Sequence, residues 1–456
     1  MKLTLIGGGG VRTPLFLMSL LRWHTRLGLT ELCLMDVDAR KLSVFAALSR
    51  ALLAQAGDPF RLTHTTDARA ALTGADYVVT AIRVGFERGR ALDERIALKY
   101  NVLGQETTGP GGFAMALRSI PAVLEYARLM QEVCPDAWLF NFTNPAGLVA
   151  QALHEAGFER VVGICDGANA AQHAVAWWCG VPASQVRAEV YGLNHLSWCR
   201  HAWHGDEDLM PRCLADDGFL REAQGMFDPE LVRMQGAFLN EYLYYYYYAE
   251  RAVEAIQADR WTRGEEIELL NARLLAQLER VDIAAEPERA LRIFFGYNRR
   301  RGETYMHYAH GAAAMPPIPE TFDGDIPEEA GEGYAGVAFS AIEALAHDRP
   351  AWIGLNVPNR GALPGMAADD VVEVTCRVDG SGVHPLPVAA IPEGHLYLMR
   401  AVKRYERLTV QAIRERSRAL AIEALMAHPL VLSYSRARGL VEDYLQAHAA
   451  YVGEWR

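Results

Sequence analysis

The first 40 residues constrain the fold of this chain more than any other segment. Residues 2–6 form a predicted strand, which runs into Gly7-Gly8-Gly9-Gly10 and then into an apolar helical pattern that opens at Thr13-Pro14. A second predicted strand, 31–36, ends on Asp36. Such a unit brings backbone N–H groups close to a dinucleotide pyrophosphate, while the acid accepts hydrogen bonds from a ribose hydroxyl. The pattern therefore predicts an NAD-binding unit.

The glycine turn departs from the usual G-x-G-x-x-G because its third glycine is missing. Counted from Gly7 or Gly8, that position holds Arg12 or Thr13. Thr13-Pro14 is instead typical of a helix N-cap followed by proline at the first helical position. An ordinary tight βα turn is the alternative interpretation, and the acid at the end of the next strand favours the nucleotide.

Strands and helices alternate through residues 1–170, which we interpret as one domain. Six alternating strands with crossover helices predict a Rossmann-type, doubly wound parallel sheet in an α/β fold, with ligands bound beyond the carboxyl ends of the strands. Arg83, Asn144 and Cys165 follow or end three of those strands. The predicted strands are 2–6, 31–36, 60–65, 76–82, 137–142 and 160–165, and helical patterns cover 14–23, 38–56 and 114–134.

Residues 171–456 predict a second, mixed α+β domain that ends in a helical tail after residue 395. The stretch 311–334, rich in Ala, Pro, Glu and Gly, is a predicted surface loop. Helices are expected near 168–180, 239–257, 265–279 and 397–426, and strands near 186–191, 194–201, 351–357 and 370–378.

Composition narrows the class of protein. A net charge of −11 argues against nucleic acid and anionic membranes as partners, and no apolar stretch is long enough to span a bilayer. Seven scattered cysteines without a C-x-x-C indicate reduced thiols in the cytoplasm. A strand that begins at residue 2 leaves no room for a signal peptide. We therefore expect a cytoplasmic globular enzyme.

Two residues could together hold a transition metal: Cys165, at a strand end, and His195, in Gly192-Leu193-Asn194-His195. Two protein ligands leave coordination positions open, as a catalytic metal requires. A buried apolar cysteine and a locally hydrogen-bonded histidine are the alternatives. Asn144, held extended before Pro145, is either a substrate-binding amide or a turn residue.

A tyrosine run and an arginine cluster complete the candidates. Most of the six tyrosines between Tyr242 and Tyr248 are expected to fill a core, although one near a metal could act as a base because positive charge lowers its pKa. Arginines suit phosphate, but they also suit ion pairs with Glu87, Asp93 and Glu94. The arginines are Arg83, Arg88, Arg90, Arg95 and Arg118.

Several long motifs in sequence order resemble glycoside hydrolase family 4, in particular its 6-phospho-β-glucosidase branch. The resemblance runs nearly end to end and implies a Rossmann domain joined to a second domain like that of lactate and malate dehydrogenases. The motifs are Ile6 to Pro14, Gly104-Gln105-Glu106-Thr107-Thr108-Gly109-Pro110-Gly111-Gly112-Phe113, Asn141 to Pro145, Gly192 to His195, Asn356-Val357-Pro358-Asn359-Arg360-Gly361 and Ala427-His428-Pro429-Leu430-Val431.

The resemblance implies an exception to two-carboxylate glycosidase chemistry. NAD transiently oxidises the sugar at C3, a base removes the C2 proton, the C1 substituent is eliminated, water adds and the hydride returns. A divalent metal, expected to be Mn²⁺, acts as a Lewis acid. A small-molecule β-glucoside is the expected substrate, and a homodimer or homotetramer the expected assembly.

The resemblance also assigns roles to residues. Cys165 and His195 match the metal ligands and Tyr242 the C2 base, with Tyr244 as the second choice. Asp166 after the cysteine favours the β-acting branch. The residues expected to contact NAD are Gly8, Gly10, Val11, Asp36 and Arg83, and those expected to contact the sugar are Asn144, Asn194, Arg90 and Arg301.

One departure bears on the substrate. Glu303, in a segment expected near the far end of the sugar, would repel a 6-phosphate if it faced the pocket. An unphosphorylated β-glucoside is therefore an alternative substrate. A simple NAD-dependent dehydrogenase of a hydroxy acid or polyol, a non-catalytic NAD-binding protein and a conventional paired-carboxylate glycosidase are the other functions left open.

Overall fold

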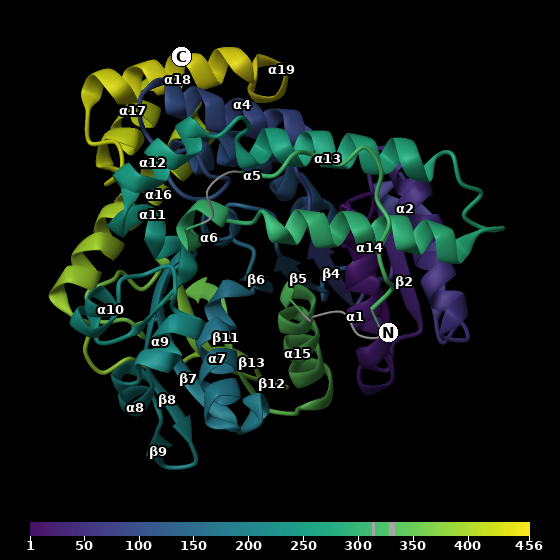
Figure 1. Cartoon of the computed structure of the whole chain (residues 1–456), viewed down its shortest axis with the longest axis horizontal. Helices are drawn as coiled ribbons and strands as arrows, with labels where there is room; N and C mark the ends of the chain where they lie inside the picture. The colour runs from purple at the N-terminus through teal and green to yellow at the C-terminus, as the bar shows by residue number, and fades with distance from the viewer. Residues whose placement is uncertain (312–314, 328–332) are drawn as a thin grey trace.

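The computed structural model describes residues 1–311, 315–327 and 333–456. Its core is one large sheet, to which thirteen strands of the described residues belong. Along the sheet the main strands follow the order β3-β2-β1-β4-β5-β6-β11-β12-β7-β8-β10, with β13 beside β12 and β9 beside β8. Figure 1 shows helices on both faces of this sheet.

The six N-terminal strands are all parallel and confirm the predicted doubly wound sheet. They are β1 (Lys2–Ile6), β2 (Glu31–Met35), β3 (Arg61–Thr65), β4 (Tyr77–Thr80), β5 (Trp138–Asn141) and β6 (Val161–Gly163). The strand order reverses between β1 and β4, and ligands bind at such a switch point.

The helices of this half lie where the sequence predicts them, with additional ones between. Near the N-terminus of α1, Gly7 adopts a φ of 99°, and a Cβ there would lie 2.4 Å from the Ala81 carbonyl oxygen, so only glycine fits this turn. The helices are α1 (Thr13–Leu27), α2 (Ala39–Gln55), α3 (Ala68–Leu72), α4 (Phe86–Lys99), α5 (Pro110–Val133), α6 (Ala146–Glu155) and α7 (Ala170–Cys179).

The remaining strands continue the same sheet in antiparallel fashion, starting where β11 pairs with β6. They are β7 (Val186–Leu193), β8 (Leu196–His204), β9 (Glu207–Asp208), β10 (Phe238–Leu239), β11 (Ala351–Pro358), β12 (Val371–Asp379) and β13 (Gly382–Pro385). The predicted mixed α+β architecture of this half is confirmed, and its sheet is continuous with the parallel one.

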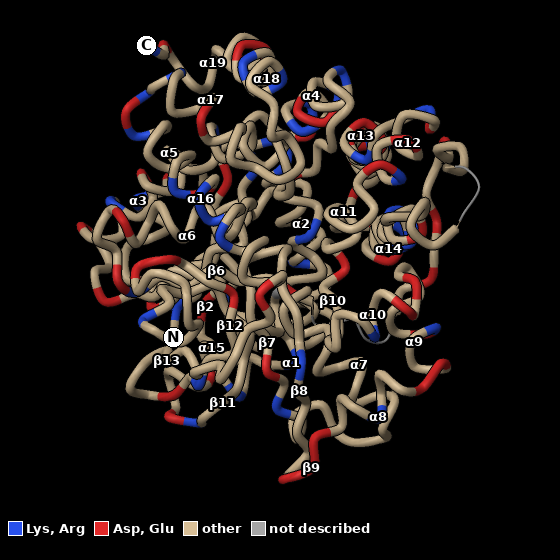
Figure 2. The backbone as a smooth tube through the Cα atoms, turned by 90° about the vertical axis from the view of Figure 1, so that its left-hand side faces the viewer, with Lys and Arg blue, Asp and Glu red and all other residues tan. Residues whose placement is uncertain are grey.

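Helices of the second half cover the sheet and the site. Figure 1 shows α13 and α14 running side by side, and α18 beside α4. Acidic and basic residues are interspersed along the helices (Figure 2). The helices are α8 (Met210–Ala215), α9 (Asp217–Ala223), α10 (Pro229–Gln235), α11 (Tyr244–Tyr247), α12 (Ala249–Ala258), α13 (Arg263–Leu278), α14 (Pro287–Glu303), α15 (Gly333–His347), α16 (Glu393–Glu415), α17 (Arg418–Ala427), α18 (Tyr434–Ala447) and α19 (Ala449–Val452).

Two predicted helices are interrupted. The helix expected over 397–426 is split into α16 and α17, because Arg416 adopts a left-handed φ of 50° and the Ser417 side chain caps α17. The helix expected over 239–257 is split into the 3₁₀ turn η3 (Glu241–Leu243), α11 and α12. Residues 312–314 and 328–332 of the predicted loop lie outside the described residues, while 315–327 contain no helix or strand.

Within the described part of the chain, no helix is both long and apolar enough to cross a membrane.

Candidate active site

A cavity of about 850 Å³ lies at the carboxyl edge of the parallel strands. Four segments that follow β1, β4, β5 and β6 contribute Gly10, Arg83, Asn144 and Cys165 to its wall, and the β7–β8 turn contributes His195. The sheet register explains this convergence, because the last residues of the four parallel strands are direct neighbours across the sheet. The switch point between β1 and β4 therefore opens into one cavity.

The glycine turn forms one end of the cavity. Gly9 donates its backbone N–H to Asp36 Oδ2 at 2.9 Å. Burial raises the pKa of Asp36 above its ordinary value, although the N–H groups of Asp38 and Gly9 oppose this shift. Gly10, Val11 and Asp36 all line the cavity, where a dinucleotide would meet backbone N–H groups and a carboxylate.

Gly8 does not line the cavity. Its N–H donates to the Met35 carbonyl at 2.8 Å, and a Cβ at Gly8 would lie 2.7 Å from Leu34 Cβ. A glycine is therefore required at position 8 because the turn packs closely against β2.

Cys165, His195 and Tyr242 come from three separate segments and meet at one wall. His195, in the left-handed region at φ 62°, stacks on the ring of Tyr242 with centroids 3.5 Å apart and planes 6° apart. A Cβ placed on Gly167 would lie 3.8 Å from Cys165 Sγ and 3.9 Å from Tyr242 Cε2. The thiol and the imidazole thus flank the same tyrosine, although 30 residues separate them in sequence.

The chemistry of these side chains fits a divalent metal. His195 Nδ1 is buried and has no hydrogen-bond partner in the described part of the chain. Burial lowers the pKa of His195 to about 3, so the imidazole is in its neutral, metal-binding form. Burial also raises the pKa of the Cys165 thiol, which a bound metal would convert to a thiolate.

Cys165 and His195 are the ligand candidates that the sequence named at this wall. No group of three or more His, Cys, Asp and Glu side chains among the described residues could hold a metal ion. A cation at this wall would therefore keep coordination positions open for substrate oxygens or water, as in catalytic metal sites.

The structure distinguishes between the two candidate tyrosines. Tyr242 lines the cavity, and Tyr305 Oη lies within hydrogen-bond distance of Tyr242 Oη, at 2.5 Å, and of Glu241 Oε1, at 3.0 Å. Tyr244 is buried against Tyr248, with ring centroids 5.0 Å apart, and does not line the cavity. Burial raises the pKa of Tyr242, so the phenol needs a nearby cation to act as a base at neutral pH.

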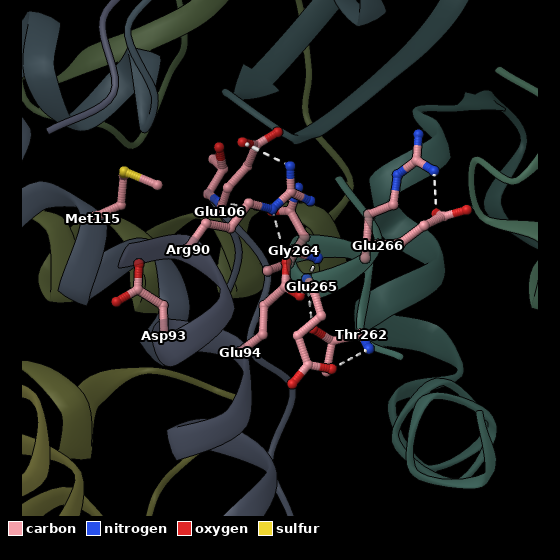
Figure 3. Close-up of polar contacts among 12 residues, drawn as sticks. Arg90, Asp93, Glu94, Glu106, Met115, Thr262, Gly264, Glu265 and Glu266 are labelled. Atoms are coloured by element: carbon pink, nitrogen blue, oxygen red, sulfur yellow. Dashed lines mark hydrogen bonds and ion pairs between the residues drawn. The ribbon is translucent and has the colours of Figure 1, made fainter. Parts of the chain in front are cut away.

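A second part of the cavity wall, around Glu106, consists of charged side chains. Arg83 Nη2 and Arg90 Nη1 lie 2.6 and 3.2 Å from Glu106 Oε2, and Arg90 Nε donates to Glu94 at 2.8 Å. Glu94 also accepts the Gly264 N–H at 2.6 Å, which joins α4 to the start of α13 (Figure 3). Burial alone would raise the pKa of Glu106, but the two guanidinium groups outweigh it and lower that pKa.

The predicted arginine cluster thus divides between the cavity and structural ion pairs. Arg83 and Arg90 line the cavity. Arg118, fully buried, pairs with Asp93 at 2.6 Å, and Arg95 pairs with Glu265 at 2.5 Å. Arg88 lies 3.8 Å from Glu268.

Arg301, from the last turn of α14, adds positive charge. Its Nε is buried without a partner among the residues described, and so is Nη1 of Arg83. Burial, and then the neighbouring Arg12, lowers the pKa of Arg301 to about 10. Buried N–H donors on two guanidinium groups of one cavity are typical of an anion site.

Glu303 does not face the cavity. It is exposed at the end of α14 and lies 3.8 Å from Arg299. The repulsion of a 6-phosphate considered from the sequence therefore has no structural basis.

The two asparagines differ in their placement. Asn144 lines the main cavity, whereas Asn194 is buried outside it and donates to Glu373 at 3.3 Å. Glu241 and Tyr305 are among the cavity-lining residues that the sequence interpretation missed. The sequence could have indicated both, because Glu241 directly precedes Tyr242 and Tyr305 lies four residues after Arg301.

The comparisons with known proteins identify the family of this chain. The model for the family 4 glycosyl hydrolases matches residues 2–180, and that for the family 4 glycosyl hydrolase C-terminal domain matches residues 190–431. The chain therefore belongs to family 4 of the glycosyl hydrolases, and it is an enzyme of the glycosidase class.

Its relatives are similar along their whole length. A probable 6-phospho-beta-glucosidase of Bacillus subtilis is 29% identical over 100% of this chain and 98% of its own. The 6-phospho-beta-glucosidase of Escherichia coli is 28% identical over 99% and 96%. The Thermotoga maritima 6-phospho-beta-glucosidase, solved with manganese, NAD⁺ and glucose-6-phosphate, superimposes with a TM-score of 0.82 at 28% identity and 99% coverage of both chains.

A malate dehydrogenase of Salinibacter ruber shares the fold alone. It superimposes with a TM-score of 0.52 at 16% identity, covering 91% of this chain and 99% of its own. The predicted dehydrogenase-like architecture is therefore confirmed.

Proposed function

We propose that this chain is an NAD- and divalent-metal-dependent glycosidase that hydrolyses 6-phospho-β-glucosides. The observation that carries the proposal is the meeting of Cys165, His195 and Tyr242 at one wall of the cavity that begins at the glycine turn. Relatives named as 6-phospho-beta-glucosidases, one of them solved with manganese, NAD⁺ and glucose-6-phosphate, support it.

Arg301 favours a phosphorylated substrate over a plain glucoside. It presents a buried N–H without a partner in the described chain, and a phosphate would accept this bond. The outward position of Glu303 removes the charge that would oppose it.

We assign each cofactor to its own set of residues in the cavity. Gly10, Val11 and Asp36, with Arg83 nearby, would hold NAD, and Cys165 with His195 would hold a divalent ion, with Mn²⁺ expected. When bound, NAD supplies a reversible hydride acceptor for C3 of the sugar, and the ion supplies Lewis-acid polarisation of the neighbouring oxygens.

Tyr242 is our candidate for the base. With Tyr242 ionised by the neighbouring cation, the C2–H bond breaks with its proton passing to the phenolate oxygen, and the electron pair forms the C1–C2 double bond. The C1–O bond breaks with its electron pair on the leaving oxygen, which takes a proton from water. Tyr305, hydrogen-bonded to Tyr242 Oη, would fix the direction of that oxygen. Asn144 would orient the sugar by hydrogen bonds to its hydroxyls.

We further propose that the enzyme works in the cytoplasm as a homodimer or homotetramer. All seven cysteines are free, which suits a reducing compartment.

A substrate panel tests the proposal. The purified chain is supplied with NAD⁺ and Mn²⁺ and offered 6-phosphorylated and plain glucosides of both anomers. We expect cleavage of the 6-phospho-β-glucosides that requires both additions and leaves no net NADH. Stoichiometric NADH from a free hydroxy acid, or full activity after NAD⁺ is removed, would contradict it.

A further inference from the structure

Glu373, on β12, is a buried carboxylate that no part of the proposed chemistry uses. It has 0% exposure and accepts three hydrogen bonds, all from neutral side chains. Ser197 Oγ donates to Oε2 at 2.6 Å, and Asn356 and Asn194 donate to Oε1 at 3.2 and 3.3 Å. No Lys, Arg or His of the described residues forms a salt bridge with it.

The sheet register places Glu373 near the two segments that carry the proposed metal ligands. Gly163, two residues before Cys165, is the neighbour of Asn356, which is the neighbour of Glu373. Glu373 in turn neighbours Gly192, at the end of the strand that leads into the His195 turn. Through Asn194 and Ser197 it holds the residues on both sides of His195.

The same carboxylate is linked to the segment that carries Tyr242. Ser197 Oγ accepts from Asn240 Nδ2 at 3.1 Å, and Asn240 Oδ1 accepts from the Tyr242 backbone N–H at 3.0 Å. The Asn240 N–H donates to the Ser197 carbonyl at 3.1 Å. Each side chain in this chain of hydrogen bonds donates to the next: Asn240 donates to Ser197, and Ser197 donates to Glu373.

We propose that Glu373 is a positioning residue that sets the His195 turn and the Tyr242 segment in register with each other. The proposal rests on the roles assigned above to those two residues. Groups that orient metal ligands typically change metal affinity or activity 10- to 100-fold when they are lost, so a shared anchor should affect both.

The variant Glu373→Gln tests the direction of the chain. If the glutamine carbonyl still accepts from the two asparagines, the glutamine amide faces Ser197. Ser197 Oγ must then accept two N–H groups, and the Ser197 hydroxyl proton has no acceptor. We expect kcat and Mn²⁺ affinity each to fall about 10-fold.

A second substitution should repair this loss by reversing the chain. In Asn240→Asp, one carboxylate oxygen still accepts from the Tyr242 N–H, while the other accepts from Ser197. Alone, this change sets two carboxylates against one hydroxyl proton, so we expect a similar loss. In Glu373→Gln/Asn240→Asp the amide donates to Ser197 and Ser197 donates to Asp, and kcat should return to within about 3-fold of wild type.

Glu343→Gln is the matched control. Glu343 is also a buried carboxylate, but it pairs with Arg26 and Arg349 away from the cavity. Glu343→Gln should lower Tm while leaving kcat and Mn²⁺ affinity unchanged. This result would distinguish the effect of losing a buried charge from the effect of losing a positioning residue.

Mn²⁺ titration, and the position of Tyr242 in crystals of the variants, keep this test separate from the proposed function. If the wild type cleaves no glycoside, those two measurements still decide the role of Glu373. If Glu373→Gln does not fold, Ser197→Ala breaks the same link. The proposal would be overturned if Glu373→Gln, or Ser197→Ala in its place, kept the kcat and Mn²⁺ affinity of the wild type. It would also be overturned if the double variant had a kcat no higher than that of Asn240→Asp alone.

Discussion

Two walls of one cavity are built in different ways. At the wall of Cys165, His195 and Tyr242, the imidazole stacks on the phenol ring, and the hydrogen bonds of Glu373 lie beside them. At the wall of Arg83, Arg90 and Glu106, fixed charges are paired in short ion bridges. Both are largely buried, so the difference is not one of solvent exposure.

The difference indicates a division of labour. A proton transfer needs groups whose charge can change, and ring stacking and hydrogen bonds hold such groups in place without fixing that charge. Binding an anion needs charge that does not change, and guanidinium groups supply it at any physiological pH. We therefore expect substitutions at the first wall to act on kcat and substitutions at the second on KM or stability.

The largest effect is expected for Tyr242→Phe. Loss of the base should reduce kcat about 10³-fold while NAD⁺ and Mn²⁺ binding remain close to wild type. Single-turnover rates and cofactor titrations measure the two separately. Tyr244→Phe is the control, because that ring packs outside the cavity, and its kcat should change less than about 2-fold. A large loss of kcat in Tyr244→Phe, together with a normal kcat in Tyr242→Phe, would reverse the assignment.

Cys165→Ser should have the next largest effect. A hydroxyl is a poorer ligand than a thiolate for a transition metal, so Mn²⁺ affinity should fall about 100-fold and activity should return in part at high Mn²⁺. Calorimetric titration of Mn²⁺ measures this directly. Cys134→Ser, at a buried thiol outside the cavity, should bind Mn²⁺ normally. Unchanged affinity in Cys165→Ser would remove the metal site.

Arg301→Met tests the second wall. Loss of charged hydrogen bonds to a phosphate, worth about 2 kcal/mol, should raise KM for a 6-phospho-β-glucoside about 30-fold with little change in kcat. The poor cleavage of the plain glucoside should stay the same. Glu303→Gln, exposed at the end of the same helix, should leave both values unchanged. An equal loss on both substrates in Arg301→Met would exclude a phosphate contact.

Glu106→Gln should have the smallest effect on turnover and a measurable one on stability. The carboxylate pairs with Arg83 and Arg90, so its loss should lower the free energy of unfolding by about 3 kcal/mol at pH 7. Because the pKa of Glu106 is lowered in the folded state, its stabilisation is complete above the unfolded carboxyl pKa and is lost as pH falls through the folded value. The gap between wild type and variant should therefore narrow on acidification below about pH 4 in urea titrations. A constant gap would contradict this.

The parallel half of the fold could be predicted because its signals are local. Each strand is a short apolar run before a turn, and the carboxyl ends of parallel strands necessarily share an edge. The sites after β4, β5 and β6 followed from that alone. The helix α14 was not predicted, and Arg301 on its last turn could be proposed only from the family resemblance.

The antiparallel half could not be predicted in the same way. The distance between Cys165 and His195 depends on where β7 and β8 join the sheet, which no spacing in the sequence reveals. Tyr242 and Tyr244 are equivalent as sequence and differ only because a 3₁₀ turn, capped by Asn240, turns the first toward the cavity. The asparagine cap was a readable signal for the break in that helix.

Turnover of a 6-phospho-β-glucoside in D₂O, with NAD⁺ and Mn²⁺ present, tests the central claim most directly. Removal of the C2 proton by Tyr242, followed by return of a solvent proton, predicts deuterium at C2 of the product. A product that carries only hydrogen at C2, formed at the normal rate, would contradict it.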